Sequence, residues 1–233
     1  MRKVAVYVEG MTELVFVYHC ILAYYHSDWT AFHLDYVSVN PSDRIDLLNP
    51  YGDEAAENRF LIYNCGSDDR VFPTMKDRFQ AHLQQGYDRI IGLQDVLGAR
   101  YLELYKAGHQ QIEWDKVNEM IHDLESSVFQ QDPSGTMKIR FSIMEIEAWI
   151  LAMPDLLSEC FPGRPLDDLL AVNPEVSYVH PFNKLSSLVP YAKNFSTVEG
   201  IFSRINSAHL DTLLQSRKCS SFAHFYDCLF LLD

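Results

Sequence analysis

The chain has 233 residues, of which 48% are hydrophobic and 22% are charged, and this composition excludes an intrinsically disordered protein. Its 19 Lys and Arg against 32 Asp and Glu give a net charge of −13, which argues against a chain that binds nucleic acid by itself through bulk electrostatics. The five Cys residues form no CxxC pair, so neither a zinc ribbon nor a redox motif is predicted. Neither a transmembrane helix nor a signal peptide is expected, which favours a cytoplasmic protein with no membrane association.

The first 153 residues are predicted to alternate between strands and helices. Apolar, β-branched runs predict strands at 3–8, 32–39, 59–65, 87–93 and 136–143. Helical patterns occur at 14–25, 68–85, 101–108, 115–129 and 145–153, and residues 40–58 are expected to form an irregular loop. Such alternation is typical of βαβ units, so we expect an α/β fold with an open, mainly parallel sheet and helices on both faces.

The pattern changes after Pro162 and Gly163. Short helices are predicted at 166–171, 182–188, 198–214 and 220–232, with no strand between them. We therefore expect an α/β domain over residues 1–160 and a helical C-terminal layer over residues 161–233 that packs on it.

Three acidic residues are predicted to share one end of the sheet. Glu9 ends the first strand, Asp95 follows the strand at 87–93, and Glu147 lies just beyond the last strand. Ligands of open α/β sheets bind at the carboxyl ends of the strands, so these side chains converge if the strands are neighbours. Clustered carboxylates repel one another unless a cation or a proton lies between them, and their oxygens suit Mg²⁺ or Mn²⁺. The alternative is that each acid is a solvated or helix-capping residue.

Three segments resemble a known family. Residues 6–13 (VYVEGMTE) resemble the signature that opens Toprim (topoisomerase–primase) domains, and residues 90–97 (IIGLQDVL) resemble the strand that carries the Asp-x-Asp motif of that family. Residues 144–152 (MEIEAWILA) resemble a Glu-Ala-Trp segment of Toprim-like bacterial proteins related to the overcoming-lysogenization-defect nucleases. The resemblance spans most of the chain and implies a Toprim-like fold.

The resemblance also implies a function. Members of this group are often encoded beside an ATPase of the ABC/SMC type, and anti-phage defence is their suspected role. The chain is then expected to be a Mg²⁺- or Mn²⁺-dependent nuclease subunit that hydrolyses DNA or RNA, with Glu9, Asp95 and Glu147 as catalytic residues and metal ligands. Gly10 is expected to permit the tight turn from strand to helix, and Glu9 is the candidate general acid or base.

The sequence departs from the family pattern at Leu97, which occupies the position of the second Asp. One carboxylate fewer is compatible with a single metal, with a site completed by a partner, or with a degenerate Toprim fold that serves as an interaction or sensor subunit. A metal-dependent phosphohydrolase acting on small nucleotides is a third reading, because an acidic surface tolerates small nucleotides better than long polymers. A homo-oligomer is left open.

Further residues are candidates to support the site or to contact the substrate. Glu13 is expected either to support the site or to be an ordinary charge in the first turn of a helix. Glu145 and Glu147 are separated by about 200° around a helix, so only one is expected to face the site, and Glu147 is favoured. The full set of supporting or substrate-contacting candidates is Gly10, Glu13, Arg140, Lys184 and Lys193, and for each of the basic residues a solvated surface charge is the alternative.

Overall fold

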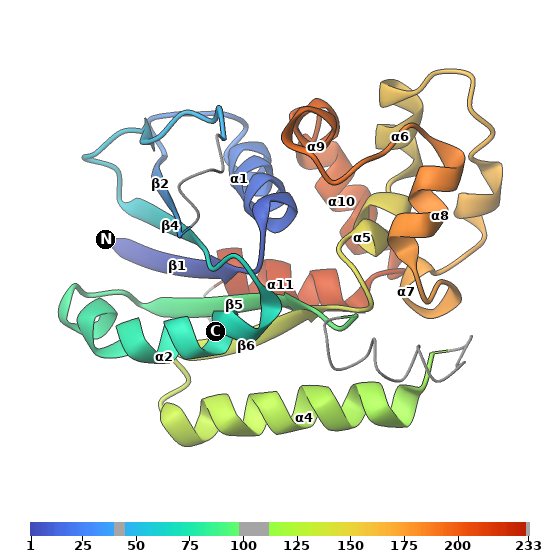
Figure 1. Cartoon of the computed structure of the whole chain (residues 1–233). Helices are drawn as coiled ribbons and strands as arrows, with labels where there is room; N and C mark the ends of the chain where they lie inside the picture. The colour runs from blue at the N-terminus through green and yellow to red at the C-terminus, as the bar shows by residue number, and fades with distance from the viewer. Residues whose placement is uncertain (40–44, 98–111, 232–233) are drawn as a thin grey trace.

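The structure is a computed structural model that describes residues 1–39, 45–97 and 112–231. Its centre is a six-stranded sheet with the order β3-β2-β4-β1-β5-β6 (Figure 1). Five strands are parallel, and only the short edge strand β3 pairs antiparallel, with β2. The strands are β1 (Arg2–Val8), β2 (Phe32–Ser38), β3 (Tyr51–Gly52), β4 (Asn58–Asn64), β5 (Arg89–Asp95) and β6 (Met137–Ser142).

Helices cover both faces of the sheet. α1 (Met11–Tyr24) and α11 (Ser220–Phe230) share an apolar cluster with one face, while α2 (Asp68–Gln84) and α4 (Trp114–Gln131) lie on the other face (Figure 1). β1 is apolar along most of its length because it is buried from both sides, as parallel strands generally are. The predicted α/β class, with a mainly parallel sheet and a helical C-terminal part, is confirmed.

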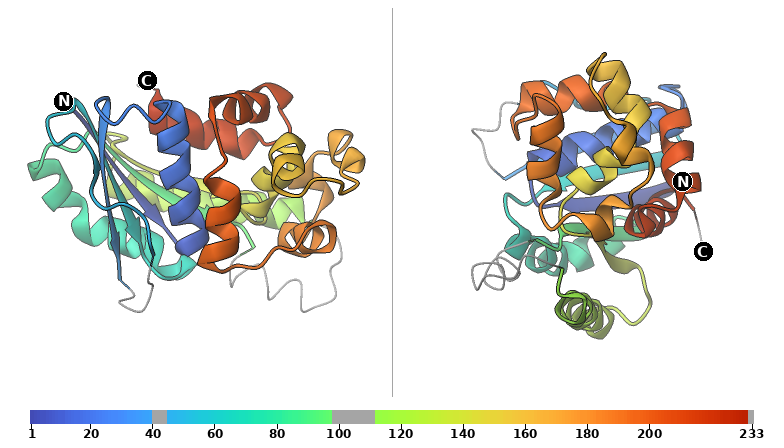
Figure 2. Two further views of the ribbon diagram at one scale, coloured as in Figure 1. Left: turned by 90° about the horizontal axis from the view of Figure 1, so that it is seen from above. Right: turned by 90° about the vertical axis from the view of Figure 1, so that its right-hand side faces the viewer.

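The described elements after β6 are all helical, and all but α11, which packs on one face of the sheet, gather beside the carboxyl ends of the strands (Figures 1 and 2). Apart from α11, they are α5 (Glu147–Leu151), α6 (Pro154–Cys160), the 3₁₀ helix η1 (Asp167–Leu170), α7 (Pro174–Ser177), α8 (Pro181–Leu188), α9 (Phe195–Phe202) and α10 (Ser207–Ser216).

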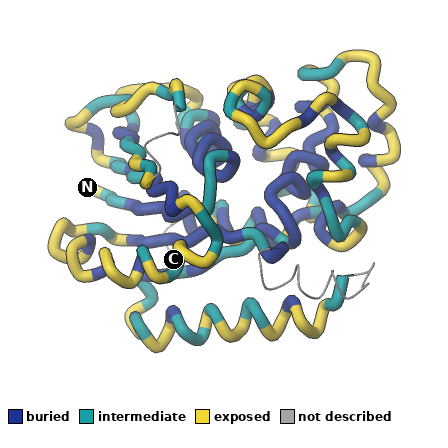
Figure 3. Tube along the Cα trace, in the orientation of Figure 1, coloured by how far each residue is buried: buried dark blue, intermediate teal, exposed yellow. Residues whose placement is uncertain are grey.

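One apolar cluster joins these helices to the sheet. The ring of Trp149, in α5, lies 5.4 Å from that of Phe16 in α1 and 5.2 and 5.7 Å from those of Phe222 and Phe225 in α11. Figure 3 shows the central strands, α1 and the inner sides of the C-terminal helices buried together. The packing therefore fixes the position of α5 relative to the central sheet. The domain boundary expected at residue 160 stays a prediction.

Several predicted elements differ from the structure. The helix predicted over 198–214 is wrong, because α9 and α10 are separate and Asn206 caps α10 by accepting the N–H of His209 at 3.1 Å. Pro154 begins a further helix, α6, since proline fits the first turn, where its missing N–H is not needed. The predicted loop at 40–58 contains β3, and the predicted helix at 101–108 lies outside the described residues. Among the described residues, no helix has the length and apolarity needed to cross a membrane.

We predict that Trp149→Ala lowers the free energy of unfolding by about 3–5 kcal/mol, because it leaves a cavity in a core that cannot close fully. Trp149 is fully buried, whereas Trp29 is 58% exposed, so Trp29→Ala is the matched control and is expected to change stability by less than about 0.5 kcal/mol. Urea denaturation followed by circular dichroism measures both variants. Equal denaturation midpoints for the two would contradict the role given to Trp149.

Candidate metal centre

The crevice of the sheet lies between two neighbouring strands whose connections leave on opposite faces. β1 leads into α1 on one face, while the next described helix after β5 is α4, on the other face. Such a reversal leaves room for a ligand at the carboxyl ends of the strands. Val8 pairs with Leu93 across the two strands, so Glu9 and Asp95 leave the sheet close together. The predicted convergence of these acids required that their strands be neighbours, and β1 and β5 are neighbours.

Three carboxyl groups form a tight cluster within the described part of the chain. Glu9, Glu13 and Asp95 each offer one oxygen, and these oxygens all lie within 4.8 Å of one another. Glu13 comes from the first turn of α1 and is only 3% exposed. Of the two roles expected from the sequence, a site residue or an ordinary helix charge, the cluster supports the first.

Gly10 matters to the cluster because it has no side chain, and not because of its backbone conformation. The tight turn from β1 to α1 is present, but the φ of −152° and ψ of −171° of Gly10 are extended values that any residue adopts, so the turn needs no glycine for its backbone conformation. A Cβ atom at this position would lie 3.0 Å from Oε2 of Glu13, closer than ordinary packing allows. The glycine therefore leaves room for the Glu13 carboxylate.

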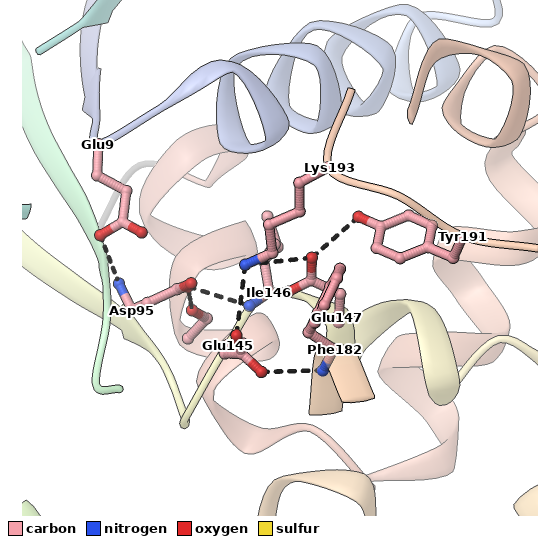
Figure 4. Close-up of polar contacts among 9 residues, drawn as sticks. Glu9, Asp95, Glu145, Ile146, Glu147, Phe182, Tyr191 and Lys193 are labelled. Atoms are coloured by element: carbon pink, nitrogen blue, oxygen red, sulfur yellow. Dashed lines mark hydrogen bonds and ion pairs between the residues drawn. The ribbon is translucent and has the colours of Figure 1, made fainter. Parts of the chain in front are cut away.

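Hydrogen bonds hold Asp95 in place. Its Oδ1 accepts a hydrogen bond from the hydroxyl of Ser142 and another, at 3.0 Å, from the N–H of Ile146 (Figure 4). Its own N–H donates to Oε2 of Glu9 at 3.3 Å. These contacts join the ends of β1, β5 and β6 around one carboxylate.

The turn after β6 brings two more acids to the crevice. Met144, which is fully buried, has a φ of +65°, a left-handed conformation that is costly for a residue other than glycine. Its carbonyl accepts the N–H of Leu97 at 2.7 Å, which fixes the turn against the segment after β5. α5 then begins at Glu147, so Glu145 lies in the turn before the helix.

Both of these acids contact Lys193. The ammonium lies 3.3 Å from Oε1 of Glu145 and 3.4 Å from Oε1 of Glu147 (Figure 4). The expectation that only one of the pair can face the site is wrong, because Glu145 precedes α5 and helical spacing does not apply between them. Glu145 is fixed further by the N–H of Phe182, which donates to its Oε2 at 2.9 Å.

Glu147 is fully buried and only half satisfied. Its Oε1 also accepts a hydrogen bond from the hydroxyl of Tyr191 at 2.9 Å, whereas its Oε2 has no hydrogen-bond partner among the described residues. Buried carboxylate oxygens are normally paired with a donor, a water or a metal ion. The orphaned oxygen therefore keeps Glu147 a candidate metal ligand, although it lies outside the tight cluster of three acids.

The crowding shifts the pKa values of the acids upward. Burial raises the pKa of Glu9 to about 8, and the nearby charge of Glu13 adds to the effect. Burial, followed by the charges of Glu9 and Glu13, also raises the pKa of Asp95. The pKa of Glu147 is raised to about 7 by its burial, against the opposing charge of Lys193. Part of the site therefore holds protons near neutral pH, and a divalent cation would displace them.

Lys193 remains charged in this environment. Burial alone would lower its pKa, but the carboxylates of Glu147, Asp95, Glu145 and Glu13 raise it above the usual value. One ammonium offsets only part of the negative charge of these acids. The remaining set of hard oxygen donors, without sulfur ligands, fits Mg²⁺ or Mn²⁺.

The other predicted residues lie elsewhere. Arg140, on β6, lies 3.6 Å from Glu125 of α4, and the Lys184 ammonium lies 5.4 Å from the ring centre of Tyr178. Leu97 packs in an apolar cluster with Val96, Val117 and Met144. Of the three predicted basic residues, the structure brings only Lys193 to the acids.

Comparisons with known proteins give a distant likeness. No family model matches the chain, and no curated protein is similar to it. Solved structures of the C-terminal region of the Xanthomonas campestris pv. campestris OLD protein are similar to it. The form phased with mercury has 14% identity and a TM-score of 0.37 over 96% of this chain and 97% of that chain. The form phased with platinum has 13% identity and a TM-score of 0.37 over 97% and 96% of the two chains.

We predict that the metal-free protein loses stability as the pH rises from 5 to 9. The folded-state pKa of Glu9 is raised from 4.5 to about 8, so its proton stabilises the folded chain fully below pH 4.5, and this contribution is lost as the pH passes 8. Glu9→Gln is expected to raise the Tm of the metal-free protein at pH 8.5 by about 5 °C relative to wild type.

Mn²⁺ titrated at pH 8.5 checks the same point, because it is expected to raise the Tm of wild type but much less that of Glu9→Gln. Glu54→Gln, which removes an exposed acid, is the control and is expected to behave as wild type. If the Tm values of wild type and Glu9→Gln respond identically to pH and to Mn²⁺, this account of the cluster is refuted.

Proposed function

We propose that this chain is a Mg²⁺- or Mn²⁺-dependent nuclease that hydrolyses phosphodiester bonds. The observation that carries the proposal is the cluster of Glu9, Glu13 and Asp95, whose oxygens lie within 4.8 Å of one another at the carboxyl ends of β1 and β5. A divalent ion bound there would polarise the phosphoryl oxygen and supply a nucleophilic water. The resemblance of residues 6–13 to the opening signature of Toprim domains supports the same chemistry.

The side chains divide the remaining work. Asp95, oriented by Ser142 and Ile146, and Glu13 would hold the cation. A pKa of about 8 suits Glu9 to exchange a proton near neutral pH when it is not fully engaged as a ligand. The ammonium of Lys193 would face the negative charge that develops on the phosphate, where a fixed positive group lowers the barrier.

A partner would supply what the chain lacks for a long polymer. A net charge of −13 opposes the approach of a nucleic acid backbone outside the metal centre. We propose that an ATPase of the ABC/SMC type contributes positive surface and couples cleavage to its own state, in an anti-phage complex in the cytoplasm. The basis is the resemblance of the motifs to proteins encoded beside such ATPases.

One observation favours a second candidate, a degenerate subunit that binds partners without cleaving. Leu97 stands where the family pattern has an acid, and it is 9% exposed within an apolar cluster. Its side chain therefore offers no ligand to a second cation. Assembly with an ATPase, combined with no cleavage of DNA or RNA in Mg²⁺ or Mn²⁺, would establish this candidate over the nuclease.

We predict that Asp95→Asn reduces metal-dependent cleavage by at least about 100-fold, because the change removes a ligand charge while preserving the shape of the side chain. Single- and double-stranded DNA and RNA are incubated in Mn²⁺ with protein purified together with its bound partners. Asp88→Asn, at the opposite end of β5, is the control and is expected to retain wild-type rates. Wild-type cleavage by Asp95→Asn would exclude this centre as the source of activity.

We predict that Lys193→Met lowers kcat by about 100-fold or more while the protein still binds Mn²⁺, because the lysine acts on the substrate charge rather than on the metal. Removing the ammonium leaves Glu145 and Glu147 without their shared cation, so Mn²⁺ affinity is expected to stay equal or to rise. Calorimetric titration with Mn²⁺ separates the two effects. Lys184→Met is the control, and equal kcat values for the two variants would contradict the role of Lys193.

A further inference from the structure

A cavity of about 340 Å³ opens beside the candidate metal centre, between α2 and α4. This volume lies at the lower end of the ~300–1,000 Å³ that is typical of small-molecule sites. Its walls are mostly apolar and include two aromatic rings: Phe72 and Pro73 from α2, Met120, Ile121 and Leu124 from α4, and Phe141 from β6. Phe72, Leu124 and Phe141 also pack against one apolar cluster of the fold, and Met120 and Ile121 against another, so the cavity lies at the edge of the core.

Four polar residues line the cavity, and most of their side-chain polar atoms accept hydrogen bonds. They are Asp68, Asp69, Gln94 and Asp95. The amide nitrogen of Gln94 donates to the backbone carbonyl of Asp68, which fixes the orientation of the amide. Gln94 is only 8% exposed, and its Oε1 has no hydrogen-bond partner among the described residues. A buried carbonyl in this state is costly unless a water or a ligand donates to it.

These features select a ligand chemistry. Three aspartates line the cavity and oppose phosphate and other anions, so the occupant itself is uncharged or positive. The rings of Phe72 and Phe141 suit a flat, apolar group, because flat ring systems stack on aromatic side chains. The free carbonyl of Gln94 requires an N–H donor. A nucleobase with an exocyclic amino group meets all three conditions.

The position of the cavity links this ligand to the proposed reaction. Asp95 lines the cavity and also belongs to the cluster of three acids, so the two sites are continuous. We propose that the cavity binds an amino-bearing nucleobase of the substrate, next to the phosphodiester held at the metal centre, and that Gln94 accepts its amino N–H. This assignment of a base site rests on the proposed nuclease function for its role, but the binding itself requires neither metal nor phosphate.

Nucleosides therefore test the cavity apart from catalysis. Binding of adenosine and of purine riboside, which is adenosine without its amino group, is measured by saturation-transfer NMR titration in EDTA. Wild type is expected to bind adenosine at least about 3-fold more tightly than purine riboside, and Gln94→Met is expected to remove this preference. Met120→Trp fills the cavity from α4 and is expected to weaken adenosine binding by about 10-fold or more.

The control is Asn118→Trp, an equally large change at an exposed position of α4, which is expected to bind adenosine as wild type does. Thermal melts establish that each variant is folded. The base site is overturned, whatever the nuclease assays show, if wild type does not bind adenosine or if wild type and Met120→Trp bind it equally. Adenosine binding that survives in Glu13→Gln, while metal-dependent cleavage is absent from every preparation, supports the base site and refutes the nuclease role instead.

Discussion

The structure depends on how crowded carboxylates are compensated at the carboxyl ends of β1 and β5. Glu9, Glu13 and Asp95 each offer one oxygen within 4.8 Å of the others, and Glu145 and Glu147 face the same lysine nearby. Buried charges of like sign are tolerated only when a cation, a proton or a set of donors offsets them. The end of β6 contributes the hydroxyl of Ser142, the turn after it contributes the backbone N–H of Ile146, and the C-terminal segment contributes the ammonium of Lys193.

The C-terminal helices therefore complete the site as well as covering the sheet. Lys193 and Tyr191 lie between α8 and α9, and both contact Glu147 at the start of α5. α5 is itself held by Trp149, which packs against α1 and α11. The same apolar cluster that stabilises the fold thus fixes the distance between the acids of the strand ends and their cation.

Local sequence patterns predicted the five parallel strands, though not β3, and the convergence of Glu9 and Asp95, because strand ends follow directly from apolar runs bounded by polar residues. They could not separate Glu13 from an ordinary first-turn helix charge. Glu145 was misjudged because the left-handed turn at Met144 delays α5, and no glycine signals it. Lys193 could not be distinguished from Arg140 or Lys184, since its pairing with Glu147 joins segments far apart in the sequence.

The chain itself offsets the charge of these carboxylates only in part, and this affects whether protons or a cation occupy the site. One ammonium serves both Glu145 and Glu147, yet Oε2 of Glu147 has no partner among the described residues. With pKa values of about 8 for Glu9 and about 7 for Glu147, protons and divalent cations compete for the same oxygens near neutral pH. Protonation makes the crowded carboxyl groups tolerable without metal, and the same protons must leave before the oxygens can act as ligands. The affinity of the site for a cation is therefore coupled to pH across the range in which cells operate.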